Sequence, residues 1–245
     1  MSSLYLDESI PAGTVDVGDL LSVTGNEARH AVTISRVRVG ERVAIGNGAG
    51  LIAWGMVASA TAAELTITVE MVGESDPPVP RLGLVQALAK GDRDEMAVQA
   101  ATELGVDSIL PWAAARSVSR WEGARQARGR ERWQVIAREA SKQSIRATVP
   151  TVGMIATTKS LCALAGTDCV LVLDPNSPRP LTGVDLPTSG TIWVLAGPEG
   201  GISEDELTSL ETAGAHRVSL GTGILRTSTA GPAAIAVLNA QLGRW

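Results

Sequence analysis

Aromatic residues, cysteine and histidine are scarce in this chain, and each scarcity argues against a class of protein. The 245 residues include one Tyr and no Phe, although six Trp are present. An RNA-binding sheet of the base-stacking kind needs several aromatic rings, so that fold is not expected. Two Cys and two His are too few for a four-ligand zinc framework or a disulfide scaffold. We therefore expect no metal and a reducing compartment.

Long apolar runs are scarce as well. No apolar stretch reaches the roughly 20 residues that a membrane-spanning helix needs. The first residues bring acidic side chains and no basic leader segment. With 44% hydrophobic and 19% charged residues, the composition is that of an ordinary globular protein. These features predict a globular, cytoplasmic protein with no membrane partner.

Charge is unevenly distributed along the chain. The net charge is −5, yet residues 116–146 hold nine basic and three acidic residues. Residues 1–74 hold four basic and nine acidic residues. Eight of the nine cations in 116–146 are Arg, whose planar guanidinium suits paired phosphate oxygens. This stretch is either a solvated helix face or the phosphate-binding surface of a nucleic-acid-binding protein.

A proline-rich segment divides the chain into two predicted domains. Residues 75–80 contain Pro-Pro-Val-Pro, which favours extended backbone and cannot continue a helix, so they are interpreted as a linker. Residues 1–74 contain short runs of alternating polarity separated by glycine turns, which predicts a small β-barrel. Residues 81–245 alternate strand-like and helix-like patterns, which predicts an α/β domain with a largely parallel sheet.

Local patterns set the expected elements of the second domain. Strands are predicted over residues 82–88, 106–110, 169–173, 192–196 and 218–220, and helices over 92–104, 130–144, 203–213 and 227–242. Two helices carry capping-box patterns, Asp92 with Glu95 and Ser203 with Glu206. Pro111 is expected to end the second of these strands.

Two glycine-bearing loops, residues 195–202 and 220–227, lead from predicted strands into helices. Parallel α/β sheets bind ligands at the carboxyl ends of their strands, and glycine lets backbone N–H groups approach a ligand closely. Neither loop has the spacing of a Walker-type or dinucleotide-binding loop. The residues alone thus indicate a small-molecule site without naming a reaction.

Five ordered blocks of the sequence carry a family resemblance. They are His30, Arg36 and 39–41; 90–93, 102–106, Ile109, Pro111 and 116–118; Arg132, Trp133, 139–140, Gln143, Arg146 and Pro150; 197–201; and 220–221, 224–227 and 229–230. In these blocks the chain resembles the RsmE-type 16S ribosomal RNA uridine-N3 methyltransferases of the SPOUT superfamily. The match runs over nearly the whole chain, and five blocks in order are far more specific than one glycine motif.

The resemblance implies a fold, a cofactor and partners. It implies a SPOUT-type α/β domain tied in a deep trefoil knot, preceded by a PUA-like RNA-binding barrel. It implies S-adenosyl-L-methionine as cofactor, a homodimer, and N3-methyluridine in 16S rRNA of the small ribosomal subunit, near the decoding centre, as the product. The implied cofactor-binding residues are Leu173, Ala196, Gly197, Pro198, Glu199, Gly200, Gly201, Leu220, Gly221, Ile224, Leu225 and Thr229.

The implied chemistry selects candidate catalytic residues. Uridine N3 carries a proton on the Watson–Crick edge, so the base must be unpaired and the proton must leave. Arg226 is the candidate that orients the base or stabilises its anion; its alternative role is an ion pair at the helix entrance. Glu199 is the candidate carboxylate near the methyl donor, with a helix cap as its alternative. No general base is assigned, because Ser228 stands where the family usually has Glu.

The expected RNA contacts are His30, Arg36, Lys90, Arg116, Arg125, Arg128, Arg130, Arg132 and Arg146.

Two other functions stay open. One is a methyltransferase of the same superfamily that acts on another RNA such as tRNA. The other is an RNA-binding protein with an inactive cofactor site, which the substitution at Ser228 suggests. Cofactor affinity separates the inactive protein from the enzymes, and the position of the modified nucleotide separates the two enzymes.

Overall fold

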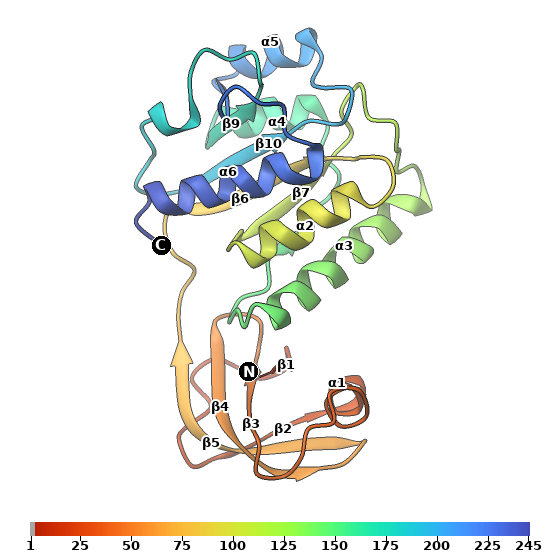
Figure 1. Cartoon of the computed structure of the whole chain (residues 1–245), viewed down its shortest axis with the longest axis vertical. Helices are drawn as coiled ribbons and strands as arrows, with labels where there is room; N and C mark the ends of the chain where they lie inside the picture. Colours follow the sequence, from red (N-terminus) through yellow and green to blue (C-terminus); the bar gives the residue numbers. More distant parts are fainter. Residues whose placement is uncertain (1–2) are drawn as a thin grey trace. The chain divides into compact units, whose positions relative to one another are not determined.

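The computed structural model describes residues 3–245, which divide into two compact units (Figure 1). One unit contains the described residues up to Pro77 together with Ser141–Val149, and the other contains Pro78–Ala140 and Pro150–Trp245. The division therefore falls inside helix α3 (Ala124–Gln143). Residues 141–149, assigned from sequence to the second domain, pack with the first unit. No proline or glycine marks the crossing between Ala140 and Ser141, whereas the return to the second unit begins at Pro150.

The first unit is built on a five-stranded sheet. Its strand order is β1 (Leu4–Leu6), β3 (Arg42–Gly46), β4 (Leu51–Ala60), β5 (Glu64–Glu74) and β2 (Leu20–Thr24). β1 runs parallel to β3, and the other neighbours are antiparallel. Among the described residues no pairing joins β1 to β2. The strands of the predicted barrel therefore form an open sheet and not a closed ring of hydrogen bonds. Helix α1 (Gly25–Arg29) and a π-helical turn (His30–Ile34) follow β2.

The second unit contains the predicted parallel sheet. Six strands lie in the order β11 (His216–Val218), β9 (Cys169–Leu173), β10 (Thr191–Ala196), β6 (Arg81–Ala87), β7 (Ser108–Trp112) and β8 (Thr151–Val152). Every neighbouring pair is parallel, which confirms the prediction of an α/β fold.

Helices cover both faces of this sheet. Helices α2 (Arg93–Glu103), α3 and α6 (Thr227–Gln241) pack on one face, and α4 (Thr158–Ala165) and α5 (Glu204–Thr212) pack on the other. Figure 1 shows α6 and α2 lying across the first face. Along β6, Leu82 and Leu84 join the α2–α6 core, whereas Val85 and Ala87 join the α4–α5 core. Burial on both faces explains the continuous apolar runs in the sequence.

The predicted end of one strand is wrong. β7 continues through Pro111 to Trp112. Proline is tolerated there because β8 has already ended at Val152, whose partner is Ile109, so no ladder bond needs the missing N–H. The carbonyl of Pro111 still accepts a hydrogen bond from the Ala156 N–H at 2.7 Å.

One predicted capping box and one predicted helix start differ from the structure. The capping box of Ser203 and Glu206 is confirmed, but Asp92 makes no side-chain cap bond at α2. Instead the carboxylate of Asp94 accepts the Ala89 N–H at 3.1 Å. Helix α3 begins at Ala124, not near residue 130, because Gly129 lies inside the helix and leaves space for the ring of Trp121. Within residues 3–245, no helix has the length and apolar character needed to cross a membrane.

Candidate active site

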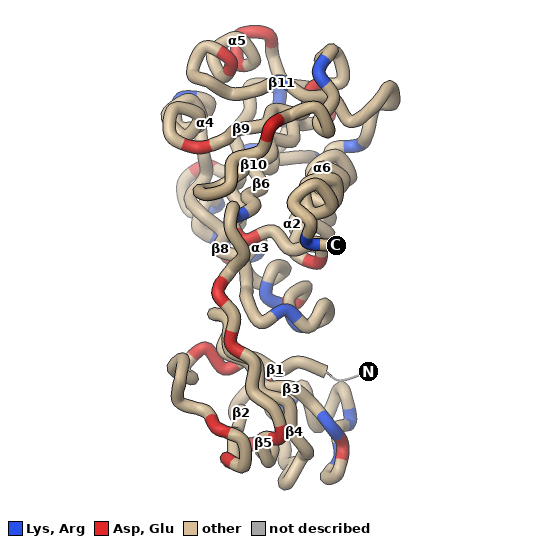
Figure 2. The backbone as a smooth tube through the Cα atoms, turned by 90° about the vertical axis from the view of Figure 1, so that its left-hand side faces the viewer, with Lys and Arg blue, Asp and Glu red and all other residues tan. Residues whose placement is uncertain are grey.

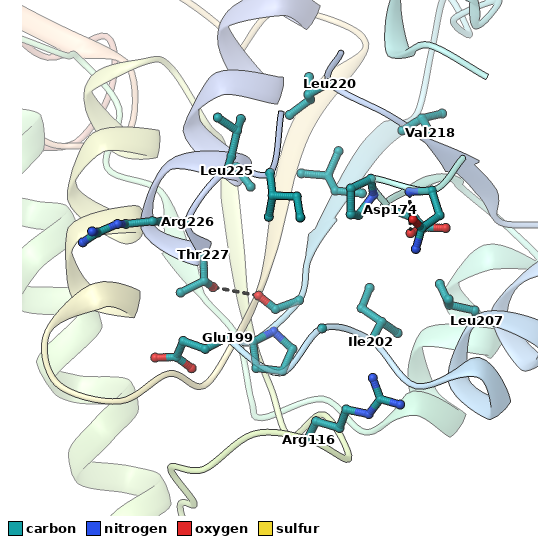
Figure 3. A pocket seen from close by; sticks show the side chains of 18 of the residues that line it. Arg116, Asp174, Glu199, Ile202, Leu207, Val218, Leu220, Leu225, Arg226 and Thr227 are labelled. Atoms are coloured by element: carbon teal, nitrogen blue, oxygen red, sulfur yellow. Dashed lines mark hydrogen bonds between the residues drawn. The ribbon is translucent and has the colours of Figure 1, made fainter. Parts of the chain in front are cut away.

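A cavity of about 590 Å³ opens at the carboxyl edge of the parallel sheet (Figure 3). Its walls come from the segments that follow β9, β10 and β11 and from the first turn of α6. These segments meet because the carboxyl ends of parallel strands lie at one edge. The volume is in the range of about 300–1,000 Å³ that is usual for small-molecule sites.

Eight of the residues predicted to bind a cofactor line this cavity. They are Leu173, Gly197, Pro198, Glu199, Gly201, Leu220, Ile224 and Leu225. The other four are not among the lining residues: Ala196 is buried in the core, Gly200 packs against the side chain of Arg116, Gly221 forms a turn with φ +84°, and Thr229 is exposed on α6.

Several lining residues were not predicted from the sequence. Asp174, Pro175 and Asn176 form the wall that follows β9, and Ile202 and Thr227 close the space between the two glycine loops. The Asp-Pro-Asn turn directly after an apolar run is a signal that could have identified the first three.

A buried chain of hydrogen bonds fixes the loop that follows β10. The hydroxyl of Thr227 donates to the carbonyl of Gly197 at 2.7 Å and accepts from Nε2 of Gln86 at 2.9 Å. Gln86 lies fully buried in β6. A Cβ on Gly197 would lie 2.7 Å from Cγ1 of Ile202, so glycine is needed for this close approach. The loop and the start of α6 are thus held in one arrangement.

Glu199 is an ionised carboxylate with partners of its own. Its Oε1 accepts the backbone N–H of Lys90 at 3.0 Å and Nη1 of Arg93 at 2.9 Å. Partial burial acts to raise the pKa of Glu199, but the backbone hydrogen bonds and the Arg93 guanidinium outweigh burial and lower it. A carboxylate of lowered pKa is a poor proton acceptor. The helix-cap alternative is wrong, because Ser203 caps α5.

Arg226 stands at the edge of the cavity. It is the N-cap residue of α6, it is exposed, and Figure 3 shows its guanidinium directed away from the centre of the cavity. Among the described residues no carboxylate pairs with it, so the predicted alternative of an ion pair at the helix entrance is not seen. Ser228 is half-buried and is the second residue of the same helix.

Asp174 holds the segment after β9, which forms one wall of the cavity, against β11. Its carboxylate accepts Nε of Arg217 at 3.0 Å, and its backbone N–H donates to the carbonyl of Val218 at 2.9 Å. The hydrogen bond to Asp174 raises the pKa of Arg217. The end of β9 is therefore tied to β11, and Asp174 is buried and already paired.

The arginines of residues 116–146 do not form one free stripe. Arg132 pairs with Glu95 at 2.9 Å. Arg130 donates to the carbonyl of Val152 at 3.0 Å, Arg146 donates to Oγ1 of Thr148 at 3.3 Å, and Arg116 donates to the carbonyl of Gly200 at 3.1 Å. Lys90, Arg125 and Arg128 are exposed. Figure 2 shows Lys and Arg positions grouped along α3.

Two of the expected RNA contacts in the first unit, His30 and Arg36, lie six positions apart in the chain. His30 is the first residue of the π-helical turn and is half-buried. Arg36 is exposed and has φ +57°, a conformation that residues other than glycine seldom adopt. No cluster of His, Cys, Asp and Glu that could hold a metal ion is found within residues 3–245.

Family models match parts of both units. Residues 75–239 match the model of an RNA methyltransferase domain, and residues 23–70 match that of an RNA methyltransferase PUA domain. The ribosomal RNA small subunit methyltransferase E of Mycobacterium bovis is 36% identical over all of this chain and 94% of its own length. The protein of the same name from Bacillus subtilis is 29% identical over 93% of this chain and 92% of its own.

Solved structures agree with these sequence matches. The ribosomal RNA small subunit methyltransferase E of Neisseria gonorrhoeae, bound to S-adenosyl methionine, aligns with a TM-score of 0.85 at 29% identity and covers 98% of each chain. A methyltransferase of Legionella pneumophila in complex with the same cofactor aligns with a TM-score of 0.84 at 25% identity, again over 98% of each chain.

Proposed function

The chain belongs to the RNA methyltransferase family that includes the ribosomal RNA small subunit methyltransferases E, and we propose that it uses S-adenosyl-L-methionine to methylate N3 of one uridine in small-subunit rRNA. The observation that carries this proposal is the cavity at the sheet edge, where two glycine loops and apolar side chains converge. It occurs in a chain that aligns over its full length with enzymes of that name.

The residues of the cavity fit this cofactor. Leu173, Val218, Leu220 and Leu225 offer apolar walls for an adenine ring. The close approach at Gly197 leaves backbone groups, not side chains, next to the ligand. When bound, the cofactor supplies an electrophilic methyl group on its sulfonium. The chain has to bind it, orient it and keep the uridine in line with it.

We assign the contact with the reacting base to Arg226. Its guanidinium has no carboxylate partner among the described residues, stands at the edge of the cavity and carries a permanent charge. A cation beside O2 or O4 of uracil stabilises the anion that forms when the N3 proton passes to solvent water. Such stabilisation reduces the need for a strong base, which neither Glu199 nor Ser228 supplies.

Glu199 acts in this proposal as a positioning residue. Through its bonds to Lys90 and Arg93 it joins the loop after β10 to the loop after β6. For RNA we propose that Lys90, Arg125 and Arg128 contact phosphates. Arg130, Arg132 and Arg146 contribute less, because each already has a partner within the protein. His30 and Arg36 stay predictions for the RNA-binding first domain.

Five further properties are proposed on the basis of the family and of the sequence pattern. The chain works as a homodimer in the cytoplasm, and its substrate is 16S rRNA near the decoding centre. Residues 1–74, 75–80 and 81–245 act as RNA-binding domain, linker and catalytic domain. The catalytic domain is knotted, as the family resemblance implies.

The deciding experiment follows labelled methyl groups from S-adenosylmethionine into RNA. Small ribosomal subunits, naked rRNA and tRNA from cells that lack this protein serve as substrates, and nuclease digestion with mass spectrometry locates the label. We expect N3-methyluridine at a single site of 16S rRNA. Label in tRNA alone would establish the other enzyme. Failure to bind the cofactor would favour the inactive RNA-binding protein, and Ser228→Glu would then be the variant to test for recovery.

A further inference from the structure

Six charged side chains line the cavity. Three of them already have an ion-pair partner, and a fourth points away from the centre of the cavity. Arg93 and Glu199 pair with each other at 2.9 Å. Asp174 is paired with Arg217. Arg226 points away from the centre of the cavity (Figure 3). One cation and one anion remain, and among the described residues neither forms an ion pair.

The remaining cation is Arg116, in the loop after β7. Figure 3 shows its guanidinium pointing into the part of the cavity next to Ile202. Its Nη1 donates to the carbonyl of Gly200 at 3.1 Å, which leaves most of its five N–H groups for a ligand. A Cβ on Gly200 would lie 3.2 Å from Cβ of Arg116, so glycine allows this loop to approach closely.

The remaining anion is Glu204, the first residue of α5, which is exposed at the same cavity. The loop that carries Arg116 is fastened to this turn of α5, because the Ala115 N–H donates to Oε1 of Glu206 at 2.9 Å. Glu206 also accepts from the capping residue Ser203 at 2.8 Å, so it is fully engaged. A guanidinium and a carboxylate are therefore brought to one end of the cavity, away from the apolar loop at Leu220.

We propose that Arg116 and Glu204 bind the amino-acid end of S-adenosylmethionine, Arg116 its carboxylate and Glu204 its ammonium group. A zwitterion is recognised by one charge of each sign held side by side, and a guanidinium can bind a carboxylate through two parallel hydrogen bonds. The inference rests on the proposed function. It moves Arg116 from the RNA contacts predicted by sequence to the cofactor site.

The test compares two ligands that differ only in the carboxylate. Isothermal titration of the full-length protein measures affinity for S-adenosylmethionine and for its decarboxylated form. The wild type should prefer the former. In Arg116→Ala, affinity for S-adenosylmethionine should fall about tenfold or more, while affinity for the decarboxylated ligand stays near the wild-type value. Arg116→Lys should keep part of the preference. Arg120→Ala, an exposed arginine outside the cavity, should behave as wild type.

Glu204 is tested with a third ligand, 5′-methylthioadenosine, which lacks the whole amino-acid chain and the sulfonium charge. Glu204→Gln should weaken binding of S-adenosylmethionine and of its decarboxylated form but leave the affinity for methylthioadenosine unchanged.

In Arg116→Ala, an equal loss of affinity for S-adenosylmethionine and for its decarboxylated form would overturn the proposal, since it would mean that Arg116 acts only through the Gly200 loop. Unchanged cofactor affinity with weaker rRNA binding would overturn it in favour of an RNA contact. A wild type that binds neither ligand would overturn the proposed function itself.

Discussion

The two glycine loops that face the cavity are constructed differently. Residues 197–202 are fastened by Thr227, by Arg116 and, through Glu199, by Lys90 and Arg93. Residues 221–226 are exposed throughout, and within the described chain residues 221–225 take part in no hydrogen bond. The first loop is thus fixed by hydrogen bonds within the described part of the protein, whereas the second loop is not.

This difference separates stability from binding. The side chains of the fastened loop gain hydrogen bonds on folding, so substitutions there should affect both stability and cofactor affinity. The open loop presents Ile224 at 85% exposure and Leu225 at 39%. Because these side chains contribute little buried area to the fold, substitutions there should spare stability and act on cofactor, RNA or the proposed partner subunit.

The largest effect is expected at the end of the open loop. Arg226→Ala should lower the rate of methyl transfer by about 10²–10³, the range found when a group that stabilises transition-state charge is removed. Its thermal midpoint and S-adenosylmethionine affinity should stay unchanged. Single-turnover transfer to small subunits measures the rate, and Arg179→Ala, an exposed arginine outside the cavity, is the control. Full transfer by the Arg226→Ala protein would remove Arg226 from the mechanism.

The fastened loop should respond in stability. Thr227→Val removes the donor to Gly197 and one of the two acceptors of the Gln86 amide, which keeps only the carbonyl of Ala87, and this should cost about 1–3 kcal/mol of unfolding free energy. It should also weaken cofactor binding, since the loop is no longer fixed. Urea unfolding and titration calorimetry measure the two effects. Thr227→Ser keeps the hydroxyl and is the matched control. Equal stability of the valine and serine variants would show that the buried chain does not hold the loop.

Sequence patterns predicted the framework of this site because the framework is local. Buried strands have continuous apolar runs, and glycines at their carboxyl ends mark the two loops. The capping box at Ser203 is likewise contained in four residues. The apolar run ends at Leu173, however, and only the Asp-Pro-Asn turn that follows it indicates that the next three residues lie at the cavity.

The contacts between segments could not be predicted in this way. Gln86 and Thr227 are 141 positions apart, and nothing near either residue shows that they meet. The run of arginines looked like one surface, yet Arg116 reaches a loop 84 positions away and Arg132 pairs with Glu95 on another helix. Tertiary packing, which has no period in the sequence, decides which of these charges are free.

A matched pair of glycine substitutions tests the two loops directly. In Gly197→Ala the new Cβ would lie 2.7 Å from Ile202, and overpacking of this kind costs about 1–3 kcal/mol. In Gly223→Ala the new Cβ meets nothing within 4 Å, so unfolding free energy should change by less than about 0.5 kcal/mol. Chemical denaturation of both variants measures the difference. Similar losses at the two positions would contradict the distinction between the loops.

The smallest effect is expected from the charge that fastens the first loop. Because the pKa of Glu199 is lower in the folded protein than its ordinary value of 4.5, ionised Glu199 favours the folded state at neutral pH. That advantage is lost as the pH falls through the pKa of the folded protein. Glu199→Gln should therefore be slightly less stable than wild type at pH 7, and the gap should close in acid.

The pair with Arg93 provides the control for this pH dependence. Solvent screens a partly exposed pair, so the gap is small and is best measured at low salt. In an Arg93→Gln background, the gap between Glu and Gln at position 199 should shrink but not vanish, because the Lys90 N–H still donates to the carboxylate. A gap of the same size with and without Arg93 would assign the lowered pKa to the backbone hydrogen bonds alone, and the loop would then be held without its ion pair.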